Sequence, residues 1–309
     1  MSEPDYERDL LVQLTRRWGR RVAVKKNELD LDGHFDVTRP DFPEHLVPVL
    51  NLPGAERLDR DARERILSAA WIAYNAKTAA IEDEIILPAC RLMLLDRIPV
   101  RRDDVAVEAL HQTIIDEHYH ILMCHNAVGV TRRRRDLGDV RFAPDVWSVV
   151  RGRAATRSGL SGIDRDIVDI AFSLAAETTI SGFLSALSTA ADIQPMNRIT
   201  TDLHRRDESG HAVVFRELCG SLYRSLDDGQ QRMFREALVH GLAAFRSADL
   251  DPWVTVAAQG GFAVGVDQLR EWAASRPVPP RDTGPLQLLL DDLGISRDLA
   301  ESLRVHPAG

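Results

Sequence analysis

Cysteine is scarce in this sequence, with three residues in a chain of 309: Cys90, Cys124 and Cys219. They are too widely spaced for a zinc finger, and isolated thiols are typical of proteins from a reducing compartment. The acidic start of the chain, MSEPDYERDL, has none of the apolar core that a secretory signal needs. These features argue against a disulfide-stabilised secreted domain, and we expect a cytoplasmic protein.

Long hydrophobic runs and an excess of positive charge are also missing. No stretch reaches the roughly 18 consecutive apolar residues that predict a membrane span, so we expect no membrane partner. Acidic residues number 47 against 39 Lys and Arg residues, which gives a net charge of −8. This charge argues against nucleic acid as the main partner.

Strand-like alternation of polar and apolar residues is almost absent, and helical periodicity takes its place. The pattern predicts helices near 5–20, 60–87, 103–128, 163–190, 197–224, 227–247 and 251–275. Pro88 should kink or end the helix that contains it. The sequence therefore predicts an all-α protein built around a helix bundle.

Turn-forming residues divide the chain into three parts. Residues 1–60 begin with a helix and continue as a loop-rich segment, which we expect to pack on the rest. Residues 61–275 carry the long helices and form the bundle domain. The stretch SRPVPPRDTGP leads into the last part, 276–309, for which we predict a linker and a short helix near 286–303.

The stretch LHRRDESGHAVVFREL, residues 203–218, places two histidines and a carboxylate on one side of a helix. At about 100° per residue, His204, Glu208 and His211 fall within about 60° of one another. Burying such a cluster is unfavourable unless something satisfies it, and a metal ion does so directly. A single E-x-x-H match is nevertheless common on solvated helix faces.

A second E-x-x-H lies in IIDEHYHILM, residues 114–123, where Glu117 and His120 follow an aspartate as in the first motif. A third match consists of Glu108 and His111. Because Glu108 lies nine residues before Glu117, it faces nearly the opposite side of the helix. We therefore leave Glu108 out of the site.

Two further carboxylates lie where solvent is not expected. Glu177 is the only charged residue between Ala171 and Thr189. Glu82 shares its helical face mainly with small and apolar residues, whereas the neighbouring Glu84 shares its face with charged ones. A lone glutamate on a helix surface would be ordinary, so the interpretation depends on all four motifs together.

The combined order E…E-x-x-H…E…E-x-x-H is the pattern of a carboxylate-bridged pair of metal ions in a four-helix bundle. Its mixed oxygen and nitrogen ligands favour iron, with manganese as a substitute, over calcium or a thiolate-bound metal. Asp116 and Asp207 each directly precede a ligand glutamate. They are natural acceptors for the N–H groups of ligand imidazoles across the bundle.

The sequence resembles the p-aminobenzoate N-oxygenase family of non-haem diiron proteins, which includes the arylamine oxygenase of chloramphenicol biosynthesis. The resemblance rests on WIAYNAKTAAIEDEI, IIDEHYH, AAETTISGFLSAL and IQPMNRITTDLHRRDESGH. It implies a ferritin-like four-helix bundle with additional flanking helices, and an extra histidine ligand at His204. The metal ligands that it implies are Glu82, Glu117, His120, Glu177, His204, Glu208 and His211.

The function implied by the resemblance is oxidation of an amine nitrogen by O2 at two iron ions, through hydroxylamine and nitroso stages to a nitro group. The substrate is then a small-molecule amine, an arylamine in the first place, with an aliphatic amine or a natural-product intermediate as alternatives. Electrons come from an external reductase or small reductant, since the sequence has no flavin or nicotinamide fingerprint. The family also suggests a homodimer.

One position departs from the family pattern. Relatives that bind a substrate carboxylate have an arginine five residues before the first ligand glutamate. This sequence has Lys77 there, whose ammonium group can pair with a carboxylate but cannot donate the two parallel hydrogen bonds of an arginine. Lys77 either meets a substrate carboxylate or lies on the helix surface. Tyr74, Phe183 and Phe245 match family positions near the site, and they are candidates for an aromatic substrate pocket or for ordinary core.

Three other functions stay open at this point. A diiron centre of the same kind also hydroxylates or desaturates carbon, which only product identification separates from N-oxygenation. A ferritin-like iron-binding protein is the second alternative, although the extra His204 speaks against it. The third is a helical scaffold with accidental E-x-x-H pairs, which would bind no metal.

Overall fold

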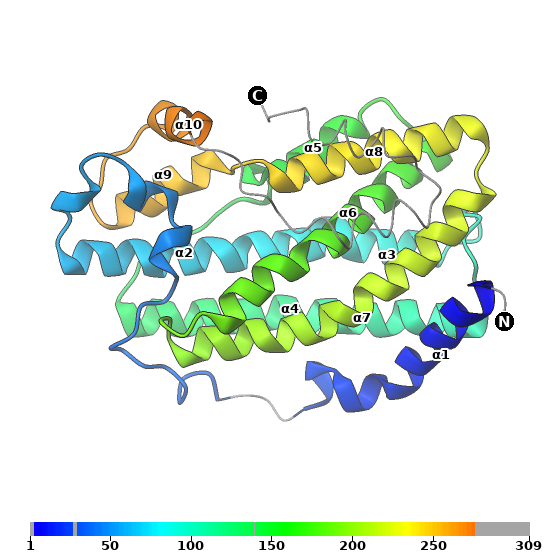
Figure 1. Ribbon diagram of the computed structural model, residues 1–309, viewed down its shortest axis with the longest axis horizontal. Helices are drawn as coiled ribbons and strands as arrows, with labels where there is room; N and C mark the ends of the chain where they lie inside the picture. Colours follow the sequence, from blue (N-terminus) through cyan, green and yellow to red (C-terminus); the bar gives the residue numbers. More distant parts are fainter. Residues whose placement is uncertain (1–2, 27–29, 139, 276–309) are drawn as a thin grey trace.

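The computed structural model describes residues 3–26, 30–138 and 140–275, and in these ranges the chain forms helices and no strand. Four long helical segments lie side by side as a bundle (Figure 1). They are α4 (Asp104–Arg135), α6 (Gly162–Thr189), α7 (Pro195–Ser225) and the continuous run of α2 (Arg60–Ile81), η5 (Glu82–Ile86) and α3 (Leu87–Met93). The expected all-α, ferritin-like bundle is confirmed.

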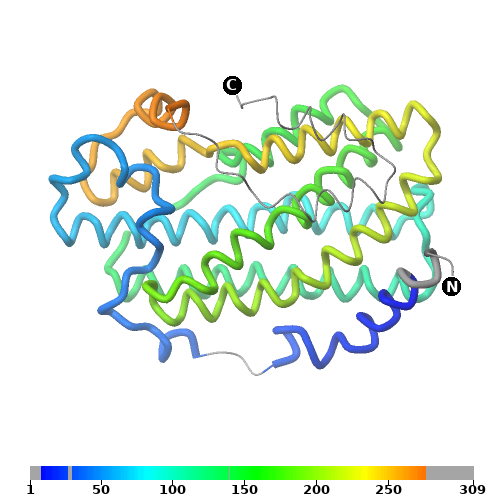
Figure 2. The backbone as a smooth tube through the Cα atoms, in the orientation of Figure 1, coloured from blue at the N-terminus to red at the C-terminus, as the bar shows by residue number. Residues whose placement is uncertain are grey.

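Shorter helices flank this bundle, as the chain trace in Figure 2 shows. They are α1 (Glu3–Arg21), α5 (Ser148–Thr156), α8 (Asp228–Arg246), α9 (Leu250–Gln259) and α10 (Val266–Ala274). Single 3-10 turns connect them: η1 (Ala23–Lys25), η2 (Glu44–Leu46), η3 (Pro48–Asn51), η4 (Ala55–Arg57) and η6 (Pro144–Val146). The predicted C-terminal linker and helix lie outside the described residues.

Aspartate caps define where two of the ligand-bearing helices begin. The side chain of Asp59 accepts from the Ala62 N–H at the start of α2, and Asp103 accepts from the Ala106 N–H at the start of α4. A cap of this kind contributes about 1 kcal/mol to helix stability. Because the first turn is fixed, the faces on which later side chains of each helix project are fixed as well.

The helix predicted to end near residue 87 continues to Met93, so the predicted end was too early. Residues Glu82–Ile86 form a π-helical turn, in which the Leu87 N–H bonds the Glu82 carbonyl five residues back. This wider turn directly precedes Pro88, which has no N–H to donate, and the helix continues through the proline. Turns of this type are frequent at functional sites, and this one begins at a predicted metal ligand.

Residues 251–275 form α9 and α10 rather than the single helix that periodicity predicts, and α5 was not predicted at all. A β-carbon on Gly260 would lie 2.5 Å from the Ala62 carbonyl oxygen, and Gly261 has a φ of +69°. The chain therefore leaves α9 where one glycine packs against α2 and the next adopts a left-handed conformation. Helical periodicity alone does not detect such a break.

The most apolar long helix of the bundle, α6, lies between α7 and α8 (Figure 1). By length and composition α6 could cross a membrane, but 67% of its most apolar window is buried inside the protein. Its side chains Phe172 and Leu174 are completely buried. In this structure α6 is the core helix of the bundle.

The N-terminal segment packs against the bundle, with α1 along α4 and α7 at the bottom of Figure 1. The loop-rich part that follows is joined to the bundle through the buried Asp41. Its carboxylate accepts from Arg135 Nε of α4 over 2.8 Å and from the hydroxyl of Ser68 of α2. The segment before α2 is therefore built into the domain through a buried charge.

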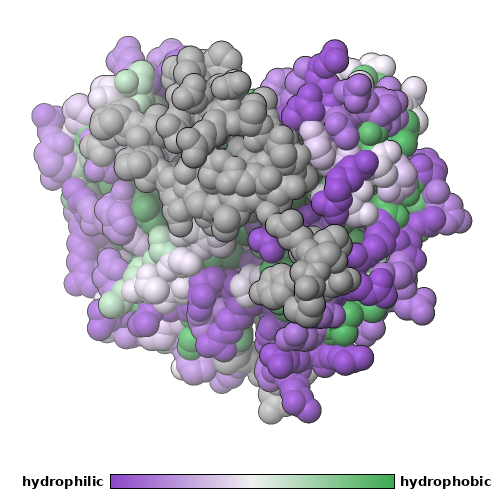
Figure 3. All heavy atoms as spheres, turned by 45° about the vertical axis from the view of Figure 1, so that its right-hand side comes forward, coloured by the Kyte–Doolittle hydropathy of each residue, from purple (hydrophilic) through white to green (hydrophobic). Residues whose placement is uncertain are grey.

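Hydrophilic side chains cover most of the coloured surface in Figure 3, in agreement with the 28% of charged residues. Among the described residues, the exposed large hydrophobic side chains are Val37, Leu95, Ile115, Leu122 and Phe183. Ile115 and Leu122 lie seven residues apart on α4, and Phe183 lies on α6 beside Tyr74. Exposed apolar surface is thus limited to a few defined places.

Candidate metal centre

All seven predicted metal ligands lie inside the bundle, and none is more than 3% exposed. Glu82 comes from η5, Glu117 and His120 from α4, Glu177 from α6, and His204, Glu208 and His211 from α7. The rejected Glu108 is exposed on α4, where its carboxylate accepts from the Gln112 amide. Burial of four carboxylates and three imidazoles is unfavourable unless their charge is compensated.

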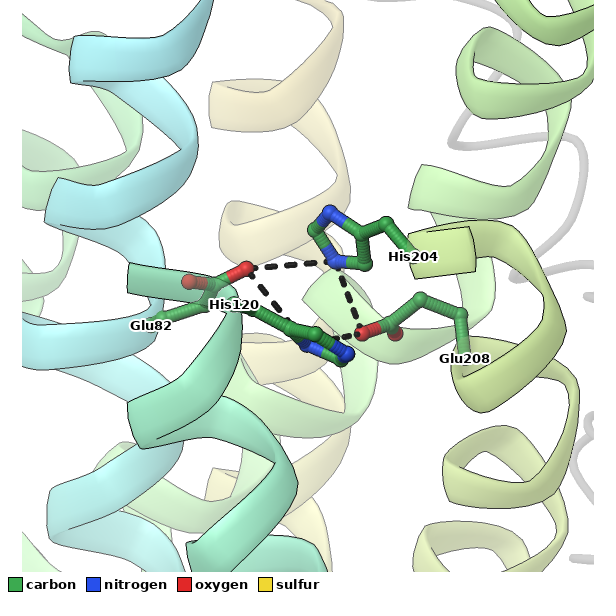
Figure 4. Close-up of side chains that lie close together, drawn as sticks. All are labelled: Glu82, His120, His204 and Glu208. Carbon is green, nitrogen blue, oxygen red and sulfur yellow. Dashed lines mark hydrogen bonds and ion pairs between the residues drawn. The ribbon is translucent and has the colours of Figure 1, made fainter. Parts of the chain in front are cut away.

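Glu208 approaches all three imidazoles of the cluster, and Figure 4 shows its carboxylate facing His204 and His120. Its Oε1 atom is 3.0 Å from His204 Nε2, 3.4 Å from His211 Nδ1 and 3.5 Å from His120 Nδ1. Glu82 Oε1 approaches from the opposite side, 3.2 Å from His204 Nε2 and 3.9 Å from His120 Nδ1. One nitrogen of each imidazole therefore faces the same space as the carboxylate oxygens.

The ligand atoms form two overlapping groups, each compact enough to hold one metal ion. Glu82, His120, His204 and Glu208 make up the first group, and Glu117, His120, Glu208 and His211 make up the second, with all atoms of a group within 4.8 Å of one another. Glu208 and His120 belong to both groups, and of the two only the Glu208 carboxylate has two oxygen atoms with which to bridge a pair of ions. Glu177 interacts electrostatically with Glu208, Glu117 and His211, which places it beside the second group.

Several buried atoms of the cluster have no hydrogen-bond partner in the protein. Both carboxylate oxygens of Glu82 and one each of Glu117 and Glu177 make no hydrogen bond. His211 Nδ1 makes none either, although it lies 2.8 Å from Glu117 Oε1, so the two groups are not aligned as donor and acceptor. Each unsatisfied buried group costs about 1–3 kcal/mol. Four carboxylates carry the charge that two divalent cations neutralise, so these residues fit a dinuclear metal centre.

Asp116 and Asp207 contact ligand imidazoles across the bundle. His211 Nε2 on α7 lies 3.3 Å from Asp116 Oδ2 on α4, and His120 Nε2 on α4 lies 3.3 Å from Asp207 Oδ2 on α7. A carboxylate at this distance holds the proton on Nε2 and fixes the ring orientation. The Nδ1 atoms of both rings are thereby left to bind metal.

The N-terminal segment donates a second hydrogen bond to each of these aspartates. Trp18 Nε1 donates to Asp116 Oδ2 over 2.8 Å, and the Ala23 N–H donates to Asp207 Oδ2 over 3.1 Å. Sequence reasoning missed both residues, because a tryptophan in RRWGRR and a backbone amide carry no metal-site signal. The structure therefore places α1 and η1 in direct contact with the groups that orient two ligands.

Burial and mutual repulsion set the protonation of the metal-free cluster. Burial raises the pKa of Glu82 to about 7, although nearby imidazoles lower it. Burial, followed by the neighbouring carboxylates, raises the pKa of Glu177 well above its usual value. Burial also acts to raise the pKa of Glu208, but the imidazoles of His211 and His204 outweigh it and hold that pKa well below the usual range. Burial also acts to raise the pKa of Glu117, but His211 and His120 lower it, so Glu208 and Glu117 both stay ionised.

The sequence matches the family described as p-aminobenzoate N-oxygenase AurF over residues 4–284. A curated relative, the 4-aminobenzoate N-oxygenase of Streptomyces thioluteus, is 32% identical over 242 residues, which cover 78% of this chain and 72% of the relative. The chain belongs to the p-aminobenzoate N-oxygenase family. The resemblance inferred from the four motifs is confirmed, and the buried cluster is the candidate metal centre of a metal-dependent N-oxygenase.

In this member of the N-oxygenase family, aromatic side chains of α2, α6 and the N-terminal segment form one stacked group. Phe183, 41% exposed on α6, stacks on Tyr74 of α2 with 5.5 Å between ring centroids. Tyr74 stacks in turn on Trp71 at 5.4 Å, and Phe42 lies 6.2 Å from it. Burial first, and then nearby negative charges that include carboxylates of the metal centre, hold the pKa of the Tyr74 phenol well above its usual value. Phe42 and Trp71 were missed from the sequence.

The other two predicted substrate residues make different contacts. Phe245 of α8 is half-buried against the main apolar core. Lys77 Nζ pairs with Asp249 Oδ2 at 2.5 Å, and the Asp249 carboxylate also accepts from the Ser148 N–H at the start of α5. Lys77 therefore joins α2 to the segment before α9. A role of Lys77 or Phe245 in substrate binding stays a prediction.

The affinity of this N-oxygenase for metal should increase as the pH rises through 7. Below its pKa of about 7, Glu82 is protonated in the metal-free chain. The surrounding carboxylates outweigh burial and raise the pKa of all three ligand imidazoles, so these are protonated as well. Metal has to displace these protons, and the binding constant should rise about tenfold per pH unit for each proton released.

Anaerobic calorimetric titration with ferrous ion, in buffers of different protonation enthalpy, measures the affinity and the released protons together. Binding that releases no protons and keeps a constant affinity between about pH 6 and pH 8 would contradict this assignment of protonation states.

Proposed function

We propose that this enzyme uses O2 and a pair of iron ions to oxidise the nitrogen of an arylamine, through hydroxylamine and nitroso stages towards a nitro product. The observation that carries the proposal is a buried set of three glutamates and three histidines, in two groups that share Glu208 and His120, with the buried Glu177 beside them. The activity named for the Streptomyces thioluteus relative supports oxygenation at nitrogen. The mixed oxygen and nitrogen ligands support iron, with manganese as a substitute.

When bound, the two ions supply the reduction of O2 and the transfer of one of its oxygen atoms to the amine. Glu82 and His204 would hold the first ion and Glu117 and His211 the second, while Glu208 and His120 lie within reach of both positions. Asp116 and Asp207 keep the rings of His211 and His120 in place. Because the ligands are almost completely buried, the protein excludes water from the reaction and limits side reactions.

An aromatic amine suits the approach to this centre. Residues 178–182 of α6, directly after Glu177, are partly or fully exposed, whereas residues 166–177 of the same helix are buried. The exposed Phe183 and the partly buried Tyr74 stack on each other on this side of the bundle. We infer that the substrate ring packs against these two aromatic faces, a contact that contributes about 0.5–1.5 kcal/mol, with its amine towards the metal ions.

An external electron donor and a reducing compartment complete the proposal. A diiron centre needs electrons to reduce O2, and we propose that a reductase or a small reductant provides them. Cys90, Cys124 and Cys219 are all buried free thiols, which supports a cytoplasmic location. An arylamine intermediate of natural-product biosynthesis is the substrate class that we infer.

Metal content and product identification test the function. Protein from iron-replete medium should hold about two irons per chain and, with O2 and a reductant, should convert arylamines to hydroxylamine, nitroso and nitro products. Oxygenated or desaturated carbon would indicate the hydroxylase alternative, and iron oxidation without any amine product would indicate ferritin-like binding. A folded chain that takes up neither iron nor manganese anaerobically would rule out the proposal.

Replacing Lys77 by alanine should raise KM for carboxylate-bearing arylamines and leave KM for neutral arylamines unchanged. The physical reason is that a buried substrate carboxylate needs a positively charged partner. Lys77 stands at the position where relatives that bind such a carboxylate have an arginine. Because Asp249 already pairs with Lys77, the substitution Asp249→Asn should free the ammonium group and lower the same KM. We expect changes of about tenfold in each direction.

Steady-state kinetics with 4-aminobenzoate and its neutral amide, on both variants, separate these effects. If the two substrates respond equally, Lys77 acts only through its packing of α2 against the start of α9.

A homodimer is the assembly that we propose, paired through the outward face of α4. Five exposed residues on this face are separated alternately by four and three positions in the sequence: His111, Ile115, His118, Leu122 and His125. The partly exposed Gly129 lies a further four positions on. Such spacing is the coiled-coil pattern for helix pairing. In an antiparallel pair centred near His118, the exposed Asp104 of one copy meets the partner's Arg133, which is 67% exposed.

Native protein should therefore run as a dimer in size-exclusion chromatography with light scattering, and Leu122→Arg should convert it to a monomer with unchanged metal content. The matched control is Leu95→Arg, which makes the same change at another exposed leucine, just after the end of α3 and outside α4. This variant should stay dimeric. A native monomer, or a dimeric Leu122→Arg variant, would show that α4 is not the interface.

A further inference from the structure

A groove of about 650 Å³ lies on the outer side of α7. The first half of α7 forms one wall, and the end of α6, η1 and α4 complete it. Its polar lining includes Lys26, Arg198 and Arg206, and its apolar lining includes Ala23 and Leu203. Arg198 Nε is buried and makes no hydrogen bond in the protein. A site of this size and charge is open to an anionic partner.

Basic residues are frequent in the two segments that supply Lys26, Arg198 and Arg206 to the groove. Six basic residues and no acidic ones occur from Arg16 to Lys26, and Arg198, Arg205 and Arg206 follow on α7. Asp202 is the only acid among the groove-lining residues, and it pairs with Arg206 at 2.5 Å. The whole chain carries a net charge of −8, so this concentration of positive charge is local. It steers negatively charged partners to this face at low salt.

The wall of the groove is connected to a metal ligand by hydrogen bonds. Ala23, which lines the groove, donates its N–H to Asp207 Oδ2 over 3.1 Å, and the same oxygen lies 3.3 Å from His120 Nε2. Tyr119 and Leu203, also in the lining, directly precede the ligands His120 and His204. The groove is therefore about one helix diameter, roughly 10 Å, from the metal centre.

We propose that this groove is the docking site of an acidic one-electron carrier protein, of the iron–sulfur or flavin type, which reduces the metal centre. This inference rests on the proposed oxygenase function, which leaves the electron donor unidentified. With two iron ions bound, two reduced carriers would each give up one electron, and the two electrons together would take the iron pair from the ferric to the ferrous state. The path runs from Ala23 through Asp207 to His120. Carriers of this kind bind through small, transient, charge-steered interfaces, which fits a groove with a basic rim.

Binding is tested first, because it needs no turnover. A fluorescently labelled acidic [2Fe–2S] ferredoxin and a flavodoxin are titrated with the metal-free and the metal-loaded protein, at low and at physiological salt. The groove variant combines Lys26→Gln, Arg198→Gln and Arg206→Gln. A control variant with the same change in charge combines Arg91→Gln, Arg165→Gln and Arg232→Gln, three exposed positions away from the groove lining. Helicity and metal content establish that both variants are folded.

The native and control proteins should bind a carrier in a salt-sensitive manner, and the groove variant should bind it about tenfold more weakly. Stopped-flow reduction of the metal-loaded proteins by the carrier should slow to the same extent in the groove variant alone. Reduction by a small neutral mediator should be equal in all three proteins.

Several results would overturn the docking site. They are unchanged carrier binding by the groove variant, native binding that does not respond to salt, and native protein that binds neither carrier. A nicotinamide nucleotide that fills the groove and reduces the centre without any carrier protein would also overturn it. Because carrier binding is measured on metal-free protein as well, failure of the oxygenase function would leave that result intact and so remain distinguishable.

Discussion

Replacing Glu208 by alanine should abolish the binding of both metal ions, and with it amine oxidation, while the protein stays helical. The Glu208 Oε1 atom lies within 3.5 Å of a nitrogen from each of the three ligand imidazoles, and Glu208 belongs to both metal-binding groups. Its low pKa keeps it ionised when Glu82 and Glu177, whose pKa values burial raises, are protonated. The loss should exceed the roughly 10–100-fold in metal affinity that removal of an outer hydrogen-bond partner causes.

Metal analysis by mass spectrometry, together with circular dichroism, measures both parts of this prediction. The control is Glu108→Ala, which removes a glutamate with the same spacing to a histidine but from the exposed side of α4. It should keep the full metal content. Two ions retained after Glu208→Ala, or equal losses in both variants, would show that the central position of Glu208 has been misread.

The substitution His204→Ala should remove one metal ion and leave the other. His204 belongs only to the group with Glu82, whereas Glu117 and His211 hold the second position without it. Metal content should fall from about two ions per chain to about one, and turnover should stop because O2 reduction needs both ions. Glu208→Ala and His204→Ala thus differ in stoichiometry, which a general loss of folding would not produce.

Metal titration followed by calorimetry should show one remaining binding step in His204→Ala. Native turnover with two ions bound would remove His204 from the ligand set. Loss of both ions would mean that the two positions cannot be occupied independently, and that the second group depends on the first.

The burial of the proposed ligands inside the bundle was predictable, because it depends on spacing within single helices. The E-x-x-H pairs have to lie on one face once the segment is helical, and helical phase also separates Glu117 from the exposed Glu108. Glu177 was visible as the only charge in a long apolar stretch. The bundle followed from the same periodicity, since four long helices that carry polar residues inwards need a common centre for them.

What the sequence did not reveal depends on contacts between distant segments. The hydrogen bonds of Trp18 and Ala23 to the two aspartates arise from the docking of α1, which periodicity does not describe. Gly210, a glycine in the middle of α7, is explained by that docking. A β-carbon at this position would lie 2.6 Å from the Arg21 guanidinium, so only glycine leaves room for the end of α1. The pairing of Lys77 with Asp249 spans 172 residues, and no local pattern indicates it.

The docking of α1 makes the first helix a participant in the metal-binding equilibrium. Trp18 bonds the carboxylate that orients His211, and Ala23 bonds the one that orients His120. Thermodynamic reciprocity requires that metal binding, where it favours the oriented rings, also favours the seated position of α1, by the same free energy. Loss of metal and release of α1 therefore promote each other. In that event the Trp18 indole would exchange its carboxylate partner for water, so a Trp18→Phe variant should lose the part of the fluorescence change on metal loading that comes from the movement of α1.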